Sequence, residues 1–358
     1  MYSGNKGEWS EIYVFLKLLS EGKLYAADEN LNKIEDNFYP VLKVIRQDTR
    51  GEFEYVRDRE IRVVDKINNN VVRESSDYEY AQQSKQLINQ IKKHEGTFNV
   101  AEVESFLNSI GVTNLKAKSS DKSDIKVVVH DYITGHQPTL GFSIKSKLGS
   151  ASTLLNAGKT TNFIFKIDSS LSDSQISAIN NIDSRSKIKD RLKAIYDAGC
   201  NLSYYGMENS VFELNLQLID SKLPDILGRM LVHYYGGEGI LLNKLTAIIE
   251  RENPCDFNTE YSHLFYKYKI QNFLTDIALG MTPSTVWNGK YDATGGYIIV
   301  KEDGEVVCYH IYNRNEFQQY LINNTRFDTA SSSRHGFGTI YKENDDAYIK
   351  LNLQVRFN

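Results

Sequence analysis

The first third of the chain carries two kinds of hydrophobic pattern. Residues 7–20 are apolar on more than one helical face, which predicts a largely buried helix with two carboxylates in its first turns. Short alternating runs between residues 39 and 73 predict an inserted antiparallel meander. Residues 76–94 and 100–110 predict two helices, because each segment opens on polar residues.

The rest of the chain mixes strand-like and helix-like segments, which predicts a mixed α/β protein. A hairpin is expected over residues 124–147, with a polar, glycine-containing turn at 134–137. Further strands are expected at 162–167, 202–205 and 212–218. Helices are expected at 152–157, 172–180 and 187–198 and over most of 222–279. Residues 295–358 should form mainly strands, with one helix at 315–323.

Length and charge narrow the possible functions. The chain has 358 residues, more than twice a typical domain of about 150. We expect two lobes, at 1–219 and 220–358. A net charge of −4 excludes proteins that bind DNA through bulk positive charge. Residues 114–166 nevertheless hold eight lysines and three aspartates, a local charge of +5 that suits a polyanionic substrate.

The chain carries no signal for export or membrane insertion. No stretch approaches the roughly 20 apolar residues of a membrane span, and the N-terminus lacks the apolar core of a signal peptide. The three cysteines form no CxxC motif, so we expect free thiols. The sequence therefore predicts a cytoplasmic protein.

Candidate chemistry gathers on the predicted hairpin. Pairing about its turn places Asp124 opposite about residue 147 and close to Lys145, and alternation puts Ser143 on the same face as Lys145. A carboxylate and a lysine at one level of a sheet are the arrangement of a metal-dependent phosphodiesterase of the PD-(D/E)xK type. There the Asp binds Mg²⁺ and the Lys orients or deprotonates the attacking water. Glu8 or Glu11 on the N-terminal helix could add a second carboxylate. The competing interpretation is a solvated surface ion pair.

Several blocks of sequence resemble the type II restriction endonucleases of the HpaII type. These blocks are residues 4–19, 141–163, 324–338 and 350–357. The resemblance implies a PD-(D/E)xK core, with a central mixed sheet flanked by helices, and a C-terminal DNA-recognition region. It also implies a Mg²⁺-dependent endonuclease that cuts double-stranded CCGG to leave 5′ overhangs. A cognate methyltransferase would act on the same site.

The resemblance also assigns residues. It implies that Asp124 binds the metal, that Lys145 is the motif lysine and that Glu11, with Glu8 as the second choice, is the acidic residue on the helix. The motif has Asp or Glu two residues before the lysine, whereas this chain has Ser143, and a neutral hydroxyl is a weak Mg²⁺ ligand. Either Glu11 replaces the missing carboxylate, or one metal held by Asp124 and the carbonyl of Ile144 suffices.

A reader of CCGG must recognise guanine and cytosine. Arg or Lys binds guanine in a bidentate manner, and acidic or amide oxygens accept hydrogen bonds from cytosine. The candidate DNA-binding residues are Arg326, Asp328, Ser333, Arg334, His335, Lys342, Gln354, Arg356, Lys147 and Lys159. A palindromic site favours a two-fold homodimer. Two alternatives stay open: a less specific metal-dependent defence or repair nuclease, and a non-catalytic DNA-binding module.

Overall fold

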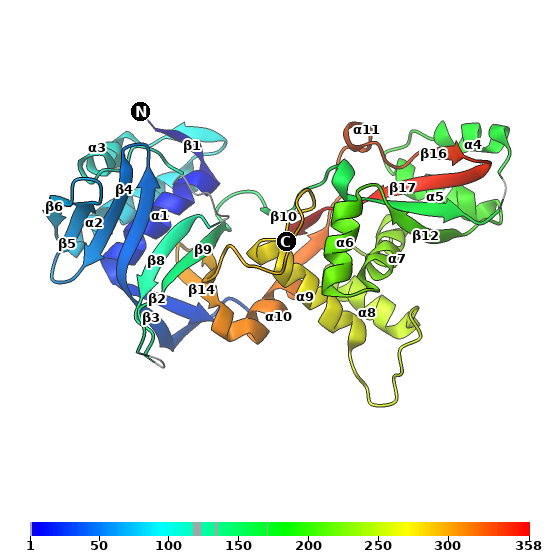
Figure 1. Cartoon of the computed structure of the whole chain (residues 1–358). Helices are drawn as coiled ribbons and strands as arrows, with labels where there is room; N and C mark the ends of the chain where they lie inside the picture. Colours follow the sequence, from blue (N-terminus) through cyan, green and yellow to red (C-terminus); the bar gives the residue numbers. More distant parts are fainter. Residues whose placement is uncertain (1, 117–122, 133–134, 170) are drawn as a thin grey trace. The chain divides into compact units, whose positions relative to one another are not determined.

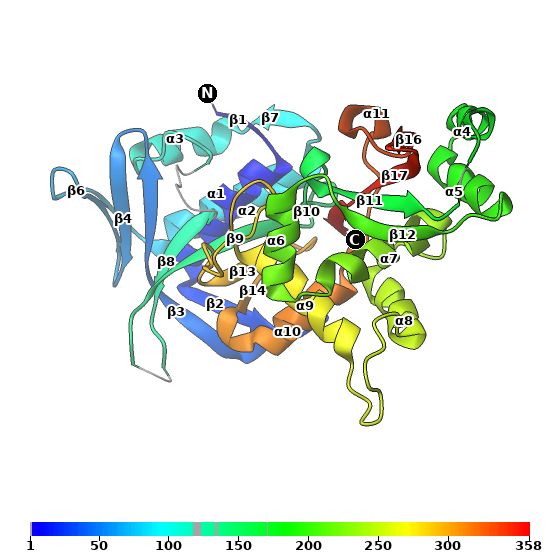
Figure 2. The same cartoon turned by 45° about the vertical axis from the view of Figure 1, so that its right-hand side comes forward.

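A computed structural model of the chain describes residues 2–116, 123–132, 135–169 and 171–358. Within these ranges the chain forms two compact units, whose elements are labelled in Figures 1 and 2. Unit 1 comprises residues 1–152 and 291–320, and unit 2 comprises 153–290 and 321–358. These units differ from the predicted lobes 1–219 and 220–358 in two ways. Residues 153–219 belong to the second unit, and residues 291–320 return to the first.

In the described part of unit 1, a nine-stranded mixed sheet forms the centre, in the order β2-β14-β13-β9-β8-β3-β4-β5-β6. The strands are β2 (Lys23–Ala27), β3 (Lys33–Asp48), β4 (Gly51–Arg57), β5 (Ile61–Asp65), β6 (Asn70–Ser75), β8 (Ile125–Val129), β9 (Thr139–Ser146), β13 (Gly296–Val300) and β14 (Val306–His310). The β13 strand runs parallel to β9, so the late segment completes this sheet. The predicted meander forms strands β3 to β6, and it continues the sheet rather than standing as an insertion.

The predicted N-terminal helix is confirmed as α1 (Lys6–Glu21). Asn5 and Glu8 form a reciprocal capping box at its start, and Gly22 ends it at φ 64°, a left-handed conformation that favours glycine. The apolar side chains of α1 are buried on several sides because α2 (Asp77–Lys93) packs against it as well as the sheet. The helix α3 (Ala101–Ser109) and the small sheet of β1 (Ser3–Asn5) and β7 (Thr97–Asn99) complete this side of unit 1.

The two faces of β9 have different surroundings. Phe142 and Ile144 belong to the hydrophobic core that contains α1. On the other face Tyr297 of β13 lies in register with Ser143, and Phe317 of α10 (Arg314–Asn323) packs against the Tyr297 ring at 5.2 Å between centroids. This alternation matches the faces predicted for the hairpin and leaves Lys145 on the side of Tyr297.

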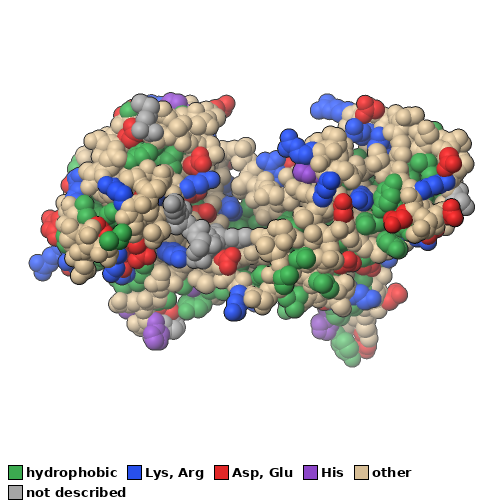
Figure 3. Space-filling model, turned by 45° about the horizontal axis from the view of Figure 1, so that its top comes forward, with side chains coloured by type: hydrophobic (Ala, Val, Ile, Leu, Met, Phe, Trp, Pro, Cys, Tyr) green, Lys and Arg blue, Asp and Glu red, His purple; other side chains and the backbone are tan. Residues whose placement is uncertain are grey.

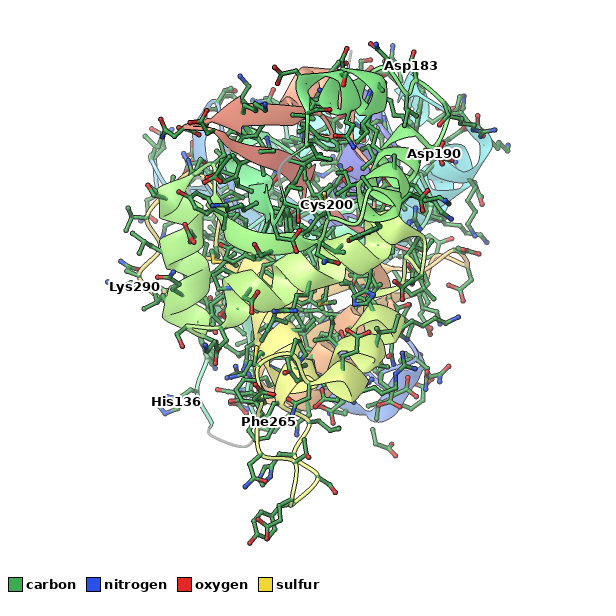
Figure 4. The ribbon with its side chains drawn as sticks, turned by 90° about the vertical axis from the view of Figure 1, so that its right-hand side faces the viewer. His136, Asp183, Asp190, Cys200, Phe265 and Lys290 are labelled. Carbon is green, nitrogen blue, oxygen red and sulfur yellow. The ribbon has the colours of Figure 1, made fainter. Side chains whose placement is uncertain are left out.

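Unit 2 is built from two small sheets and a set of helices. One sheet has the order β12-β11-β17-β16 and the other β10-β18-β15. Its strands are β10 (Thr153–Leu155), β11 (Asn162–Ile167), β12 (Leu202–Met207), β15 (Thr325–Phe327), β16 (Ile340–Glu343), β17 (Asp346–Asn352) and β18 (Val355–Phe357). Its helices are η1 (Lys159–Thr161), α4 (Asp173–Asn180), α5 (Lys187–Asp197), α6 (Ser210–Ile219), α7 (Leu223–Gly236), α8 (Leu242–Glu252), α9 (Phe265–Leu279) and α11 (Ser332–His335), several of which face the viewer in Figure 4.

Two predicted elements of unit 2 are wrong. The helix expected at 152–157 is the short strand β10, which pairs with β18 at the end of the chain. The strand expected at 212–218 is the helix α6, which buries Phe212 and Leu216 and leaves Leu214 62% exposed. Alternating leucines gave this segment a strand-like pattern, whereas the buried positions follow the spacing of a helix.

Two predicted absences can be compared with the structure. The three cysteines are free, and Cys200 is labelled in Figure 4. None of the helices in the described ranges combines the length and apolar composition that a membrane crossing requires.

Candidate active site

The pairing of β8 with β9 fixes the level of Asp124. Ile125 lies opposite Phe142, and the Asp124 amide donates to the Phe142 carbonyl at 2.8 Å. Asp124 therefore lies level with Ser143, whereas the sequence predicted residue 147. The hydrogen bond from Asp131 to the His136 carbonyl centres the turn about two residues earlier than expected. Thr134 of the predicted turn lies outside the described residues.

Asp124 is held by the next strand. Its Oδ2 atom accepts a hydrogen bond from the Ser143 hydroxyl at 3.1 Å and one from the Ile144 amide at 2.7 Å. Hydrogen bonds to a charged acceptor are stronger than neutral ones, so they fix the orientation of this carboxylate. Ser143 stands where the motif has an acidic residue, and its hydroxyl donates a hydrogen bond to Asp124.

Lys145 follows two residues later on the same face of β9. Its Nζ atom lies over the ring of Tyr297, 5.4 Å from the centroid. Burial lowers the pKa of the Lys145 ammonium, and the nearby carboxylates of Asp124 and Glu11 oppose that shift. A lysine with a lowered pKa beside two carboxylates can orient a water molecule or take up its proton.

Glu11 approaches the same place from α1. Burial, followed by the charge of Asp124, raises the pKa of Glu11 to about 8, whereas Lys116 and Arg46 act in the opposite direction. A buried carboxylate whose ionisation is disfavoured by a second carboxylate marks a position where a cation would be stabilised.

Glu8, the alternative carboxylate on α1, has structural partners. Its side chain accepts from the Asn5 amide at 2.9 Å in the capping box, and it lies 3.4 Å from the ammonium of Lys116. We therefore regard Glu11 as the better candidate for a metal ligand.

A cleft of about 860 Å³ opens in unit 1 beside these groups. The Ser10 hydroxyl donates to the Ser146 hydroxyl at 2.8 Å and joins α1 to β9 at this cleft. The cleft is lined by Asn5, Lys6, Gly7, Glu11, Glu95, Gly96, Thr97, Ile144, Lys145, Ser146, Leu148, Gly149, Ser150 and Ser152. The carboxylate of Glu11 and the ammonium of Lys145 are thus accessible from the same cleft.

The donors fit a hard divalent cation with few protein ligands. No cluster of three or more His, Cys, Asp or Glu side chains placed to hold a metal occurs among the described residues. Glu11 and Asp124 supply two carboxylates, and the Asp124 Oδ1 atom takes part in neither hydrogen bond described above. Mg²⁺ commonly uses one or two carboxylates and keeps several water ligands. The neutral Ser143 is compatible with such a site.

The candidate DNA-binding residues of unit 2 form two groups. In the first group Arg326 and Arg356 lie in register on β15 and β18, and Arg356 contacts Asp328 at 3.1 Å. The Gln354 carbonyl accepts from the Asp328 amide, which places these four residues together on one small sheet.

The second group lies on the short helix α11. Ser333, Arg334 and His335 belong to this helix, and Arg334 is exposed. The Arg334 amide donates to the Ser331 hydroxyl, which caps the helix. The His335 carbonyl accepts from the Asn162 side chain at 2.8 Å and anchors α11 to β11.

The three candidate lysines lie apart from these groups. Lys147 belongs to unit 1 and is half-buried, with its amide bonded to the Val300 carbonyl. Lys159 is exposed on η1. Lys342 on β16 forms an ion pair with Asp173 at 2.5 Å. Lys118, Asp121 and Lys122 of the basic stretch lie outside the described residues.

Sequence reasoning missed Tyr297. This side chain is 2% exposed and forms the surface under Lys145. It stands about 150 positions away along the chain, on a strand that pairs in parallel with β9. No local pattern could have linked the two residues.

We expect Tyr297→Leu to lower the single-turnover cleavage rate by about tenfold, because it removes the aromatic face beneath the Lys145 ammonium. Tyr297→Phe keeps the ring and should stay near the wild-type rate. The pH profile of cleavage should move for the leucine variant only. Equal rates and equal pH profiles for both variants would contradict this role.

Comparisons with known proteins support a nuclease site. The profile of the HpaII restriction endonuclease family matches residues 5–357. The chain is 47% identical, over 99% of both chains, to the type II restriction enzyme HpaII of Haemophilus parainfluenzae. No solved structure matches the chain significantly. Restriction endonucleases generally depend on a divalent metal ion, in agreement with the paired carboxylates of Glu11 and Asp124.

Proposed function

Because the chain belongs to the HpaII restriction endonuclease family and is a site-specific DNA endonuclease, we propose that it cleaves double-stranded DNA at CCGG and leaves 5′ overhangs. The observation that carries the catalytic part is the lining of one cleft by Glu11 and Lys145, with the carboxylate of Asp124 close to both. The specificity rests on the family and on the 47% identity with HpaII.

The proposed metal is Mg²⁺, held by Asp124 and Glu11, with the Ile144 carbonyl as a further candidate ligand. When bound, the ion would neutralise charge that develops on the phosphate. Ser143 and the Ile144 amide keep the Asp124 carboxylate in place. Lys145 orients the attacking water or accepts its proton, and Tyr297 supports the lysine from below.

A plasmid digest tests the function. The protein is incubated with plasmid and Mg²⁺, and the ends of the products are sequenced. Discrete fragments that end within CCGG, with 5′ overhangs, support the proposal. A smear would indicate a less specific nuclease, and shifted but uncut DNA would indicate a binding module without catalysis.

Arg334→Ala tests whether the exposed α11 reads guanine. We expect specific binding to weaken by about 1–3 kcal/mol, with non-specific binding reduced much less. Fluorescence anisotropy with CCGG and scrambled duplexes measures both. Lys342→Ala is the control, since its ion pair with Asp173 predicts a small and equal effect on the two duplexes. An unchanged ratio of the two affinities for Arg334→Ala would remove this residue from base reading.

The partner assignments follow from the site. A palindromic sequence is matched by a protein with two-fold symmetry, so we propose a homodimer on DNA. A methyltransferase that modifies CCGG would protect the host without contacting this protein. Analytical ultracentrifugation with a CCGG duplex tests the stoichiometry, and one chain per duplex would contradict the dimer.

A further inference from the structure

A second cleft, confined to unit 2, has a chemistry unlike that of the active site. Its volume is about 510 Å³. The lining residues are Arg185, Ser186, Lys187, Ile188, Lys189, Tyr234, Tyr235, Gly237, Thr329, Ala330, Ser331, Ser332 and Ser333. Three of these carry positive charge and five carry an aliphatic hydroxyl, while none of the described lining residues carries a carboxylate. The cleft therefore offers cations and hydroxyl groups together.

The cationic wall is the start of α5. Lys187 is neutralised by Asp183 at 3.0 Å, whereas Arg185 and Lys189 are exposed and form no ion pair with a carboxylate of the described chain. Asp183 is labelled at the outer edge of the unit in Figure 4. Lysine and arginine side chains are also visible on the upper right of Figure 3, in the part that unit 2 forms. Two cations are thus available to an added anion.

One of these cations depends on a glycine. The Nζ atom of Lys189 would lie 2.5 Å from a Cβ atom at Gly237. Gly237 ends α7 with φ 89°, where a side chain would be strained in any case. The missing side chain leaves the space that the ammonium uses.

The opposite wall is a row of hydroxyls. The Tyr234 hydroxyl bonds to the Thr329 hydroxyl at 2.7 Å and fixes this loop to α7. The Ser331 and Ser333 hydroxyls lie 3.2 Å apart at the start of α11. Hydroxyl donors that face cations suit a phosphate, whose oxygens accept both kinds of bond.

The two walls are joined by a buried arginine. Arg191 of α5 donates to the Gly338 carbonyl at 2.6 Å, beyond α11. It also donates to the carbonyls of Asn180 and Ile182, before α5. These bonds hold the turn before α5 and the segment after α11 in one framework. A preformed site loses less entropy when it binds its ligand.

We propose that this cleft binds a phosphate of the DNA backbone through Arg185 and Lys189. The proposal rests on the proposed function and deepens it, because Ser333 in the lining directly precedes Arg334 of the candidate base-reading group. Contacts to phosphates and sugars account for about half to two-thirds of protein–DNA hydrogen bonds and fix the register from which bases are read. The cleft would hold the backbone while α11 approaches the bases.

The test is the salt dependence of DNA binding by the full chain in EDTA. Affinities for a CCGG duplex and a scrambled duplex are measured from 50 to 200 mM KCl for the wild type and for Arg185→Ala/Lys189→Ala. The slope of log affinity against log salt should fall by about 1 for each lost contact, hence by about 2, on both duplexes. Lys193→Ala on the same helix, whose ammonium is paired with Asp197, should leave the slope unchanged.

Two outcomes would overturn the proposal. An unchanged slope in a double variant that melts at the wild-type temperature would show that the cleft does not contact DNA. Calorimetry could also show that inorganic phosphate binds the free wild-type protein and not the double variant. If the slope of DNA affinity against salt were unchanged in that variant, the cleft would be a site for a free anion rather than for DNA. The digest separates this result from the proposed function, since a wild type that fails to cut CCGG can still show the slope change.

Discussion

Replacement of Lys145 by alanine is expected to abolish cleavage, with a fall of about 10²–10⁴-fold in the single-turnover rate and nearly unchanged DNA binding. The expectation follows from the position of its ammonium, which is buried over Tyr297 and close to Asp124 and Glu11. A positioned acid–base group contributes a factor of this size. The nearby carboxylates of Asp124 and Glu11 offset its charge, so its loss should change the non-specific attraction for DNA little.

Two variants sharpen the Lys145 prediction. Lys145→Arg keeps the charge but cannot lose its proton near neutral pH, so a retained rate would assign the lysine an electrostatic role. Lys147→Ala, two positions along the chain and half-buried, is the matched control and should leave the rate within a few-fold of the wild type. Cleavage by Lys145→Ala within tenfold of the wild type would show that Lys145 is not the catalytic lysine.

The sequence contained enough information to predict the local elements of the site. The apolar pattern predicted α1, and the alternation predicted the β8–β9 hairpin with Lys145 and Ser143 on one face. Both patterns arise from short-range periodicity, which a single sequence displays directly. The residue opposite Asp124 was predicted incorrectly, because a shift of two residues in the centre of the turn changes which residues of β8 and β9 lie opposite each other.

Features that depend on distant segments could not be predicted. Tyr297 reaches the site through a parallel pairing between β13 and β9, and the chain between these strands contains most of unit 2. The units do not divide at residue 220 because β10 and β11 pair with β18 and β17 at the end of the chain, which draws residues 153–219 into unit 2. The helix α6 was missed for a different reason, since its leucines alternate although only Leu216 among them is buried, together with Phe212 and Asn215.

Ser143 illustrates how the structure changes the meaning of a departure from a motif. From the sequence, a serine at the acidic position left the metal ligands undecided. In the structure its hydroxyl donates to Asp124, while Glu11 brings a second carboxylate from α1. The carboxylate expected on β9 can therefore be supplied by a helix, which leaves the number of bound metal ions as the point to test. Titration of Glu11 with and without Mg²⁺ tests whether this carboxylate is one of the ligands.

The stability of the metal-free protein is expected to fall as the pH rises from about 4.5 to about 8. The folded state raises the pKa of Glu11 from 4.5 to about 8, so between these values the folded protein holds a proton that the unfolded chain releases. Stability from such a group is fully present below the unfolded pKa and is lost as the pH rises through the folded pKa. Chemical denaturation in EDTA at several pH values measures the slope.

Addition of Mg²⁺ should reverse this trend, because a metal-bound Glu11 must be deprotonated. Below pH 8 the apparent affinity for Mg²⁺ should rise by about tenfold per pH unit and then level off, with close to one proton released per ion at pH 7. Glu11→Gln should remove both the proton release and most of the cleavage activity, and it should flatten the pH dependence of stability in EDTA.

Glu8→Gln is the matched control for Glu11, three residues earlier on the same helix. It loses the ion pair with Lys116 and weakens the capping box, which lowers stability by about 0.5–2 kcal/mol. The proton release measured by calorimetry in two buffers should persist in this variant. If Glu11→Gln and Glu8→Gln release protons equally on Mg²⁺ binding, Glu11 is not a ligand, and the metal must be held by Asp124 with the carbonyl of Ile144.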